Sequence, residues 1–391
     1  LRLSGLVSCK ILMALLIWVF ITIFTEKSMN KGFLAILILF VFTSCNESLL
    51  NEDVENTPLG NFDALWDAYD KTYGAFEAKN INWDSLKIVY RSKLSQNSTN
   101  TELYNVLSGL IQCLNDGHVQ LTASGYKRFY SSGAYTIFLD VKYYENGNMI
   151  SVFYKLDFSK YINTLLADDN FVYGYMMAKI KSKKVGYLLV PTFSYNKYRQ
   201  DIVDKAFDEF KSNACAIIID LRFNGGGATE TFLKLLNMFA DQKRLYLKSK
   251  LRNGPKHSDF TQLYDHYLEP KYGTFDPKPV IVLVNRFSAS SSEHFMLGMQ
   301  TLPYVTVVGD TTYGALSTVL ENVLPNGWQF RTCPQVLCDT SGNYLRDSKG
   351  RYPDGVGLCP DVYQPNYYSD ILNGHDYMLE RAMQIISEQV K

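Results

Sequence analysis

The segment IVLVNRFSASSSEHF, residues 281–295, places a cluster of serines between an apolar run and a helix-compatible stretch. Such a strand–turn–helix junction puts one hydroxyl at a helix N-terminus, where free backbone N–H groups and the helix dipole favour negative charge. A serine there can act as a nucleophile while neighbouring N–H groups hold the oxyanion that its attack creates. Serines are also ordinary N-caps and turn formers, so this segment alone leaves both interpretations open.

A second strand–turn–helix pattern combines AIIID, residues 216–220, with LRFNGGGATE, residues 221–230. The glycines Gly225, Gly226 and Gly227 allow positive φ and a close approach of the backbone to a ligand. A phosphate-binding loop is the main alternative, but neither GxxxxGK[ST] nor GxGxxG is present. The turn therefore favours backbone N–H groups that point at an acyl oxygen.

A histidine in a third segment is a candidate base. LNDGHVQL, residues 114–121, follows a helical stretch, and His118 comes directly after its Asn-Asp-Gly turn. A neutral imidazole is a base suited to neutral pH, where a serine hydroxyl is a weak nucleophile. A lone histidine after a turn is most often a surface or capping residue, so catalysis requires it to meet the serine in space. The sequence separation does not forbid this.

Five motifs occur in an order that resembles one family: LNDGHVQL, DLRFNGGG, SASSSE after VNRF, VVGDTTYG and GVGLCPDV. The order is similar to that of the C-terminal processing (tail-specific) serine peptidases and their tricorn-core relatives, over roughly residues 61–362. The resemblance implies an α/β (α+β) fold, in which a small N-terminal helical bundle precedes a ClpP/crotonase-like ββα-superfold catalytic domain. It also implies a serine peptidase, a hydrolase that acts on peptide or protein substrates and needs no cofactor.

Carried onto this chain residue by residue, the resemblance implies that Ser290 is the nucleophile. The backbone N–H of Ser291 and that of Gly225 or Gly226 would form the oxyanion hole. Bacterial tail-specific proteases use a lysine as the base. Here Ala315 stands where that lysine would be, and alanine cannot take a proton, so a Ser-Lys mechanism is not expected.

The tricorn-like branch instead implies that His118 is the general base, oriented by a hydroxyl and a carboxylate. The hydroxyl that adjoins the histidine in the tricorn core is missing, because Gly117 precedes His118. The acid falls on Asp354 of YPDGVGLCPD, with Asp361 as the alternative. His294 is a rival base, since it lies four residues after the nucleophile and hence on the same helix face.

Composition narrows the remaining classes. The chain has 391 residues, 47% of them hydrophobic, and a formal net charge of zero without a basic stripe, so nucleic acid is not an expected partner. No Cys/His spacing predicts a zinc site, and no metal is expected. Cys113 and Cys215 sit in apolar runs and predict buried thiols, whereas Cys333 and Cys338 are close enough in sequence for a loop-closing bridge.

The N-terminus predicts a targeting region and is left out of the fold. Residues 29–31, the apolar run Phe33–Phe42 and the following Cys45 resemble a bacterial lipoprotein signal. Residues 1–45 are then an upstream segment plus signal peptide, and Cys45 is the lipidated residue. A transmembrane anchor is the alternative, but the run is shorter than the roughly 20 residues that a span requires. We therefore expect a membrane partner through the lipid anchor, at the outer-membrane, periplasmic or surface face of a bacterial cell envelope.

The rest of the chain divides by pattern. Residues 46–60 are polar and predict a tether, whereas residues 61–118 carry aromatic and aliphatic residues at helical spacing. Three helices are expected there, beginning at Asn61 and continuing over Trp83–Leu94 and Thr101–Leu114. Residues 119–391 change to strands and then to a βαβ pattern, which predicts the peptidase catalytic domain with no clear PDZ module.

Two other function classes remain open from the sequence. A catalytically decayed relative on the same fold would be an apolar-ligand or peptide-binding protein, although an intact SASSSE and His118 argue against decay. A crotonase-like acyl-CoA enzyme shares the superfold, but a lipidated, exported location without CoA disfavours it. The predicted reaction is therefore peptide-bond hydrolysis, in which His118 takes a proton from Ser290 and then gives it to the leaving amine.

Overall fold

The computed structural model describes residues 54–132, 161, 164–168, 171–177, 183–271, 273 and 275–390. The predicted signal peptide, Cys45 and most of the tether lie outside these residues, as does much of the predicted strand region before residue 184. The described residues belong to one compact unit, Leu50–Lys391. Within the described ranges, no helix is both long enough and apolar enough to cross a lipid bilayer.

Three helices open the described chain, at the positions that the hydrophobic spacing predicts to within three residues. They are α3 (Pro58–Thr72), α4 (Trp83–Arg91) and α5 (Asn100–Gln112). Helix α3 starts earlier than expected because Thr57 caps it, with Oγ1 accepting the N–H of Gly60 at 3.0 Å. Pro58 then occupies the first turn, where a missing N–H costs no hydrogen bond.

The helices pack on a small antiparallel sheet whose strands come from two segments that are far apart in the sequence. Its strand order is β11 (Leu320–Val323), β12 (Gln329–Thr332), β1 (Gln120–Thr122) and β2 (Phe129–Tyr130). The ring of Tyr69 on α3 lies 5.7 Å from that of Phe330 on β12, and the Tyr69 hydroxyl donates to the Arg331 carbonyl at 2.7 Å. Helices and strands therefore share one hydrophobic core.

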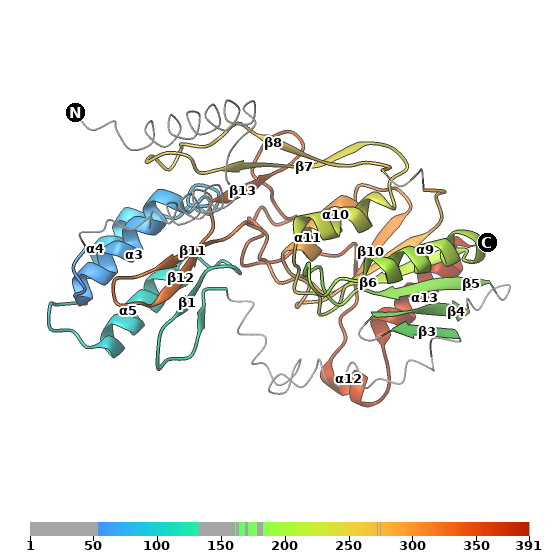
Figure 1. Cartoon of the computed structure of the whole chain (residues 1–391), viewed down its shortest axis with the longest axis horizontal. Coiled ribbons are helices and arrows are strands. Elements are labelled where there is room, and N and C mark those ends of the chain that lie inside the picture. The colour runs from blue at the N-terminus through green and yellow to red at the C-terminus, as the bar shows by residue number, and fades with distance from the viewer. Residues whose placement is uncertain are drawn as a thin grey trace, which may run out of the picture. The chain divides into compact units, whose positions relative to one another are not determined.

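A seven-stranded sheet forms the centre of the larger part of the molecule (Figure 1). Two of its strands, predicted from β-branched runs, are buried along their whole length, as expected when both faces of a parallel sheet are covered. The neighbouring strands β5, β6, β9, β10 and β14 pair in parallel. Strand β4 pairs antiparallel with β5, and β3 pairs antiparallel with β4. The order is β14 (Val362–Tyr363), β10 (Val305–Gly309), β9 (Val280–Val284), β6 (Ala216–Asp220), β5 (Lys184–Leu189), β4 (Phe171–Met177) and β3 (Thr164–Asp168).

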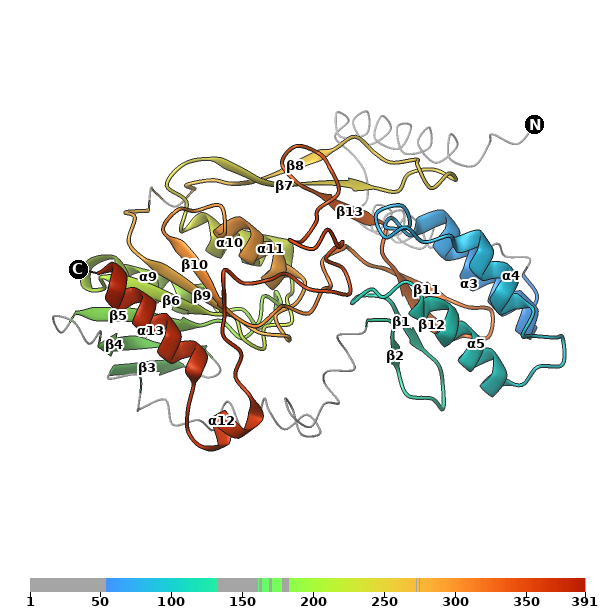
Figure 2. The same ribbon diagram turned by 180° about the vertical axis from the view of Figure 1, so that it is seen from behind.

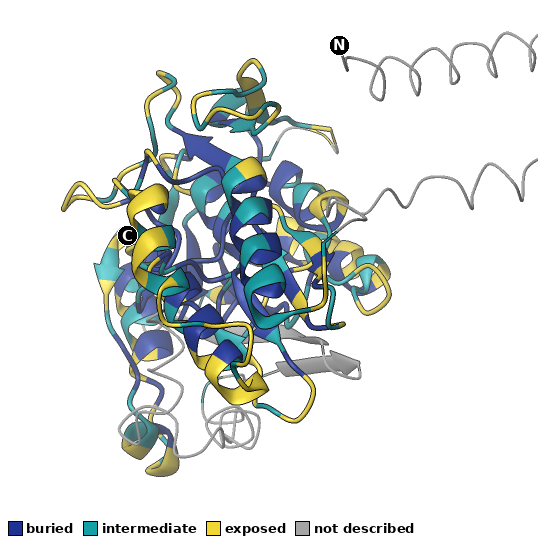
Figure 3. Ribbon diagram, turned by 90° about the vertical axis from the view of Figure 1, so that its left-hand side faces the viewer, coloured by how far each residue is buried: buried dark blue, intermediate teal, exposed yellow. Residues whose placement is uncertain are grey.

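Helices cover both faces of this sheet. On one face lie α9 (Gln200–Asn213), α10 (Thr229–Asn237) and α11 (Ser291–Met299), which share a core with the strands. On the other face lies α13 (Tyr377–Gln389), in front of the strands in Figure 2 and preceded by the short helix α12 (Tyr368–Leu372). Buried residues gather between these layers, while the outward turns of the helices are exposed (Figure 3).

A third sheet joins the two cores, with strand order β13 (Gln335–Cys338), β7 (Arg244–Leu251) and β8 (Tyr264–Leu268). The two cysteines expected to be close enough for a bridge lie just before β13 and at its last residue. Cys333 and Cys338 are both free buried thiols, so no bridge joins them. The predicted burial of Cys113 and Cys215 is wrong, since Cys113 is exposed and Cys215 is partly exposed. Cys113 follows the end of α5 and Cys215 precedes β6, so neither lies inside an element.

Candidate active site

Ser290 occupies the turn between β9 and α11 in a conformation that few residues adopt. Its φ is 57° and its ψ is −119°, whereas non-glycine residues are rarely found at positive φ. Such a conformation stores roughly 1–3 kcal/mol of strain and persists only where the surroundings impose it. One imposed contact is a hydrogen bond from the Ser290 N–H to Glu293 Oε2 at 2.9 Å.

The hydrogen bonds of the serine cluster distinguish Ser290 from its neighbours. Ser288, Ser291 and Ser292 donate their hydroxyls to backbone carbonyls within residues 221–227, at 2.9, 2.7 and 2.8 Å. These hydrogen bonds hold the serine turn, residues 288–292, against the glycine turn, residues 221–227. Among the described residues, the Ser290 hydroxyl donates to no such carbonyl, and Ser290 lines a cavity instead. Ser290 is therefore the serine of the cluster that is placed to react.

Several backbone N–H groups beside Ser290 are unengaged. Within the described residues, no acceptor takes the N–H of Ser291, Gly225 or Gly227, and both Ser291 and Gly227 line the cavity. The N–H of Gly226, one of the two predicted donors, is instead given to Asn224 Oδ1 at 2.9 Å. Gly227 was not predicted as a donor, because the sequence does not distinguish among three adjacent glycines.

Gly226 has a packing role that explains why the turn needs glycine there. Its φ is +93°, and a Cβ at this position would lie 2.7 Å from Ser290 Cβ and 2.9 Å from the Ser291 nitrogen. At Gly225, by contrast, a Cβ would meet nothing within 4 Å. The glycine turn thus presses directly against the serine turn at one residue and is open at the preceding one.

Glu293 holds the serine turn and the segment after β10 together. Its buried carboxylate accepts hydrogen bonds from Ser290 N–H, from the Thr312 hydroxyl at 2.5 Å, and from the N–H groups of Gly314 and Ala315 at 2.8 and 2.9 Å. Burial raises the pKa of Glu293, and the donated hydrogen bonds oppose that rise. Sequence reasoning gave this residue no role, although a Ser-x-x-Glu spacing is a capping-box signal.

His118 reaches the site because glycines let three loops meet. The Gly117 N–H donates to the Gly314 carbonyl at 3.1 Å, and the Gly355 N–H donates to the same oxygen at 2.7 Å. A Cβ on Gly117 would lie 2.3 Å from that oxygen. Close packing therefore explains why a residue with a hydroxyl side chain cannot precede His118 in this chain.

His118 and Ser290 line one cavity of about 250 Å³. Burial lowers the pKa of His118, while the negative charge of Asp116 and the nearby backbone of Ser317 act in the opposite direction. The His118 Nδ1 atom is buried and has no hydrogen-bond partner within the described part of the chain. The imidazole is therefore neutral near pH 7 and in a state that can accept a proton.

Asp354 lies beside this region without contacting the imidazole. Its Oδ1 accepts the Leu316 N–H at 2.6 Å and its Oδ2 accepts the Ser317 hydroxyl at 2.7 Å. No hydrogen bond joins Asp354 to His118 among the described residues. Burial, together with repulsion from Asp116, raises the pKa of Asp354 to about 7. The carboxylate thus positions the loop that faces His118.

The alternatives to His118 and Asp354 have other partners. His294 Nε2 lies 2.8 Å from the Leu316 carbonyl, which can only accept, so this nitrogen carries the proton. Burial lowers the pKa of His294 to about 4. Asp361 accepts from the Gln300 side chain at 2.9 Å and from the Val307 N–H at 2.8 Å, so it ties α11 to β10.

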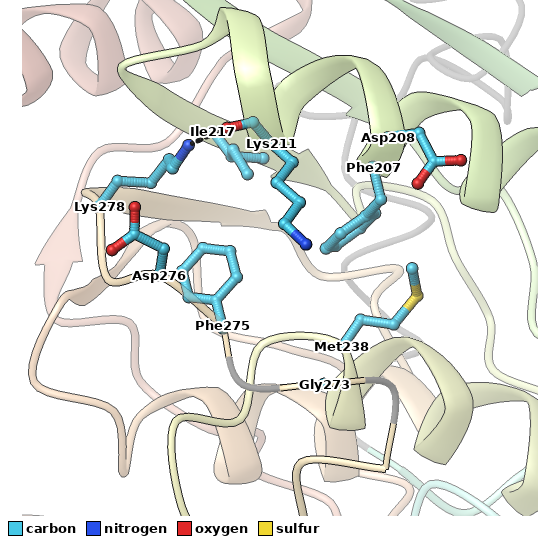
Figure 4. A pocket seen from close by; sticks show the side chains of 9 residues that line it. All are labelled: Phe207, Asp208, Lys211, Ile217, Met238, Gly273, Phe275, Asp276 and Lys278. Carbon is cyan, nitrogen blue, oxygen red and sulfur yellow. Dashed lines mark hydrogen bonds between the residues drawn. The ribbon is translucent and has the colours of Figure 1, made fainter.

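A second, smaller cavity of about 110 Å³ lies between α9 and the segment before β9 (Figure 4). Ser290 is not among the residues that line it. Its lining includes Lys278, whose ammonium group donates to three carbonyls within residues 210–214 at the end of α9. That lysine caps a helix. Within the described ranges, no group of three or more His, Cys, Asp or Glu side chains is arranged to hold a metal ion.

The site combines an unengaged serine hydroxyl on a strained turn, unengaged amide donors beside it and a neutral imidazole on the same cavity. This is the set of groups that acyl transfer through a serine requires: a nucleophile, a stabiliser for the oxyanion and a base. Together with a covered parallel sheet, these are the groups that a serine hydrolase would need.

Sequence comparisons agree with that class. The profile of peptidase family S41 matches residues 184–363, and the profile of the tricorn protease C1 domain matches residues 55–112. Residues 184–363 are thus similar to the serine peptidases of family S41, and residues 55–112 are similar to the tricorn protease C1 domain.

Two curated relatives are carboxy-terminal processing proteases of Bacillus subtilis. The chain is 27% identical to CtpB over 193 residues, which are 49% of this chain and 36% of CtpB. It is 27% identical to CtpA over 190 residues, which are 49% of this chain and 38% of CtpA. The match thus spans well under half the length of either relative.

Solved structures share the fold over most of the described chain. A structure from Parabacteroides merdae, assigned as a peptidase, is 27% identical with a TM-score of 0.69, covering 85% of this chain and 97% of its own. A structure of mature CPAF is 13% identical with a TM-score of 0.64, covering 85% and 97%, which is a likeness of fold. The predicted fold class is confirmed.

Proposed function

We propose that this protein hydrolyses peptide bonds in peptide or protein substrates through an acyl-enzyme formed on Ser290. The observation that carries the proposal is that the Ser290 hydroxyl, the Ser291 residue with its unengaged N–H and the His118 imidazole line one cavity. The strained backbone of Ser290 supports it, since such strain concentrates at sites of reaction. The similarity to CtpB and CtpA, which are carboxy-terminal processing proteases, also supports it.

In the proposed reaction His118 accepts the proton of the Ser290 hydroxyl as the oxygen attacks the substrate carbonyl. The negative charge that develops on the carbonyl oxygen is stabilised by the Ser291 N–H and by an N–H of the glycine turn. Of the two predicted glycines, Gly225 has the unengaged N–H, whereas Gly226 would first exchange its bond to Asn224. His118 then protonates the leaving amine, and water attacks the ester with His118 again as the base.

We assign Asp354 a positioning role within this mechanism. It holds the Leu316 N–H and the Ser317 hydroxyl, and the Ser317 backbone in turn faces the His118 ring. Asp354 therefore acts on the base through the loop and not by a direct bond. Each carboxylate oxygen of Asp354 accepts one hydrogen bond from residues 316–317, which fixes the carboxylate against that loop.

The test is labelling with a fluorophosphonate probe together with peptide hydrolysis by purified protein. Wild-type protein should be labelled on Ser290, and Ser290→Ala should lose both label and hydrolysis. His118→Ala should lose most of both, while His375→Ala, at an exposed position, should keep them. An unlabelled wild-type protein that binds apolar ligands would instead support the catalytically decayed alternative.

We also propose that the protein is lipidated on Cys45 and anchored in the bacterial cell envelope. The proposal rests on the signal-like residues 29–45. A Cys45→Ser variant should leave the membrane fraction of expressing cells, and mass spectrometry of the wild-type mature N-terminus should show a diacylated or triacylated cysteine. An unmodified Cys45, or membrane retention of the variant, would refute the anchor.

A further inference from the structure

The cavity at Ser290 extends away from the nucleophile along an apolar wall. Phe232 and Leu233 on α10, Tyr246 on β7, and Leu316 and Val319 of the segment before β11 line it. Phe232, Tyr246 and Leu316 are buried among their neighbours, so the protein fixes the positions of these side chains. An apolar wall next to a nucleophile removes a substrate side chain from water.

The polar groups of the same wall are paired with one another. Both the N–H and the hydroxyl of Thr318 donate to Gln335 Oε1, at 3.1 and 3.0 Å. Gln335 Nε2 donates to the Ser249 hydroxyl at 3.2 Å, and that oxygen lies 2.8 Å from His266 Nε2. Since these partners are satisfied internally, the wall requires no polar group from the substrate.

The wall is also uncharged near neutral pH. Burial lowers the pKa of His266, with Asp265 opposing the shift, and burial lowers the pKa of His294 to about 4. None of the described residues that line the cavity is Asp, Glu, Lys or Arg. A charged substrate side chain would therefore lose its hydration without gaining a counter-charge, which is disfavoured.

The chain path indicates which substrate residue uses this wall. Gly227 belongs to the turn that offers N–H groups to the acyl oxygen, and Thr229, Phe232 and Leu233 follow it directly along α10. The wall thus begins at the donors that hold the carbonyl. The side chain nearest to those donors is that of the residue whose carbonyl is attacked.

We propose that this cavity selects large, uncharged, apolar side chains at the acyl position, with Phe and Leu preferred over Ala, and Ala preferred over Lys and Glu. The inference rests on the proposed function and names the substrate class of the same site. A cavity of about 250 Å³ is only partly filled by a methyl group, so Ala forfeits the burial of several carbon atoms. The ring-lined wall, which includes Phe232 and His294 with ring centroids 5.9 Å apart, suits an aromatic side chain.

The first test is a panel of acetylated tetrapeptides that carry a 7-amino-4-methylcoumarin leaving group and differ only in the last residue: Phe, Leu, Ala, Lys or Glu. We expect kcat/KM for Phe and Leu to exceed that for Ala by roughly ten- to fifty-fold. Lys and Glu should fall on the order of 100-fold or more below Leu. A panel in which Lys, Glu or Ala equals Leu would overturn the proposal.

The second test uses the same side chains in peptidyl diphenyl phosphonates, which modify a reactive serine without needing turnover. The rate of Ser290 modification should follow the same order. Ser290 labelled by a simple fluorophosphonate but modified equally fast by all five phosphonates would refute the selectivity alone. Absence of any Ser290 labelling would refute the proposed function itself, so the two failures are distinguishable.

A designed change of charge tests the wall directly. His266→Asp places a carboxylate in the cavity, so the Lys substrate should gain at least ten-fold relative to the Leu substrate. His375→Asp is the matched control, because His375 is exposed and lies outside the cavity lining, and it should leave the order unchanged. An unchanged Lys-to-Leu ratio in a folded His266→Asp protein would contradict the inference.

Discussion

At the scale of single residues, Ser290 is defined by its backbone as much as by its hydroxyl. The hydroxyls of three serines around it donate hydrogen bonds that hold two turns together. The strained Ser290 between them donates no such bond. A turn residue chosen only for stability would relax to negative φ or would be glycine. The strain is therefore a cost that the fold bears at the position where the proposed chemistry takes place.

Replacing Ser290 by Gly and by Ala separates this strain from the loss of the hydroxyl. Both variants should lose hydrolysis, but only glycine adopts a φ of 57° freely. After allowing for the greater freedom of glycine in the unfolded chain, Ser290→Gly should be more stable than Ser290→Ala by about 1 kcal/mol. Differential scanning calorimetry should show a Tm a few degrees higher for the glycine variant. A higher Tm for Ser290→Ala would contradict the strain.

The base makes a prediction for the pH dependence of activity. Burial lowers the pKa of His118 below its usual 6.5, so the neutral, proton-accepting form persists to lower pH. The acid limb of kcat/KM for an uncharged substrate should therefore have its midpoint below pH 6.5. Steady-state rates between pH 4 and 8 measure it. A limb centred clearly above pH 6.5 would exclude His118, in this environment, as the group that must be neutral.

At the scale of elements, the site depends on two strand–turn–helix units pressed against each other. Strands β6 and β9 are neighbours in the parallel sheet, so their carboxyl ends bring the glycine turn beside the serine turn. The Ala289 N–H donates to the Asn224 carbonyl at 3.0 Å, one of several bonds between the turns. The donors and the nucleophile are thus carried by adjacent rigid strands, which fixes their relative position.

The two predicted glycines of the oxyanion turn should respond differently to alanine. Gly226→Ala would place a methyl group 2.7 Å from Ser290 Cβ at a φ of +93°, so it should displace the nucleophile and reduce kcat/KM by at least 100-fold. Gly225→Ala meets nothing within 4 Å and keeps its N–H, so it should stay within a few-fold of wild type. Hydrolysis assays on both folded variants make the comparison; equal activities would show that the contact does not matter.

Glu293 provides a second prediction at this scale. Four donors from two segments point at its carboxylate, and glutamine in its place would turn an NH2 group toward two of them. Glu293→Gln should therefore lose about 2–4 kcal/mol of unfolding free energy and most of the hydrolysis. Urea unfolding gives the first quantity. Ser92→Ala, a change on the exposed end of α4, is the control and should alter neither. Wild-type stability of Glu293→Gln would mean that the carboxylate is already protonated.

At the scale of the whole molecule, the site joins parts of the chain that are far apart in sequence. The loop with His118 follows the N-terminal helices, and the segment of residues 314–317 and the loop around Asp354 both come from the last quarter of the chain. They meet where Gly117, Gly314 and Gly355 approach backbone to backbone. The N-terminal helices and the peptidase sheet must therefore both be in place before the base can reach the nucleophile.

The partly buried histidine His294 should couple the stability of the whole unit to pH. Its pKa is about 4 in the folded protein, below the 6.5 of an unfolded chain, so the unfolded state binds more protons between these values. The stabilisation is complete above pH 6.5 and declines as pH falls towards 4. Urea unfolding should show that wild type loses about 2 kcal/mol more than His294→Gln between pH 7 and 4.5. Equal losses in the two proteins would contradict a neutral buried imidazole.

The sequence predicted the local elements well, because these depend on patterns that neighbouring residues set. The β-branched runs at residues 216–220 and 280–284 are strands over the predicted residues, and Ser290 lies at the predicted turn. The start of α3 was misplaced because its cap, Thr57, and its first turn precede the hydrophobic repeat. Glu293 was missed because three of the four donors to its carboxylate come from a segment that follows β10.

The sequence by itself determined the family pattern, the fold class and which serine and histidine were candidates, since residue type and order carry that information. Only the tertiary structure decided that Ser290 keeps a free hydroxyl, that Asp354 holds Leu316 and Ser317 in place of the imidazole, and that the cavity beyond the nucleophile is uncharged. These properties depend on contacts between residues that are remote along the chain. They arise when the packed sheet and the close-packed glycines bring separate loops into contact, which no local pattern specifies.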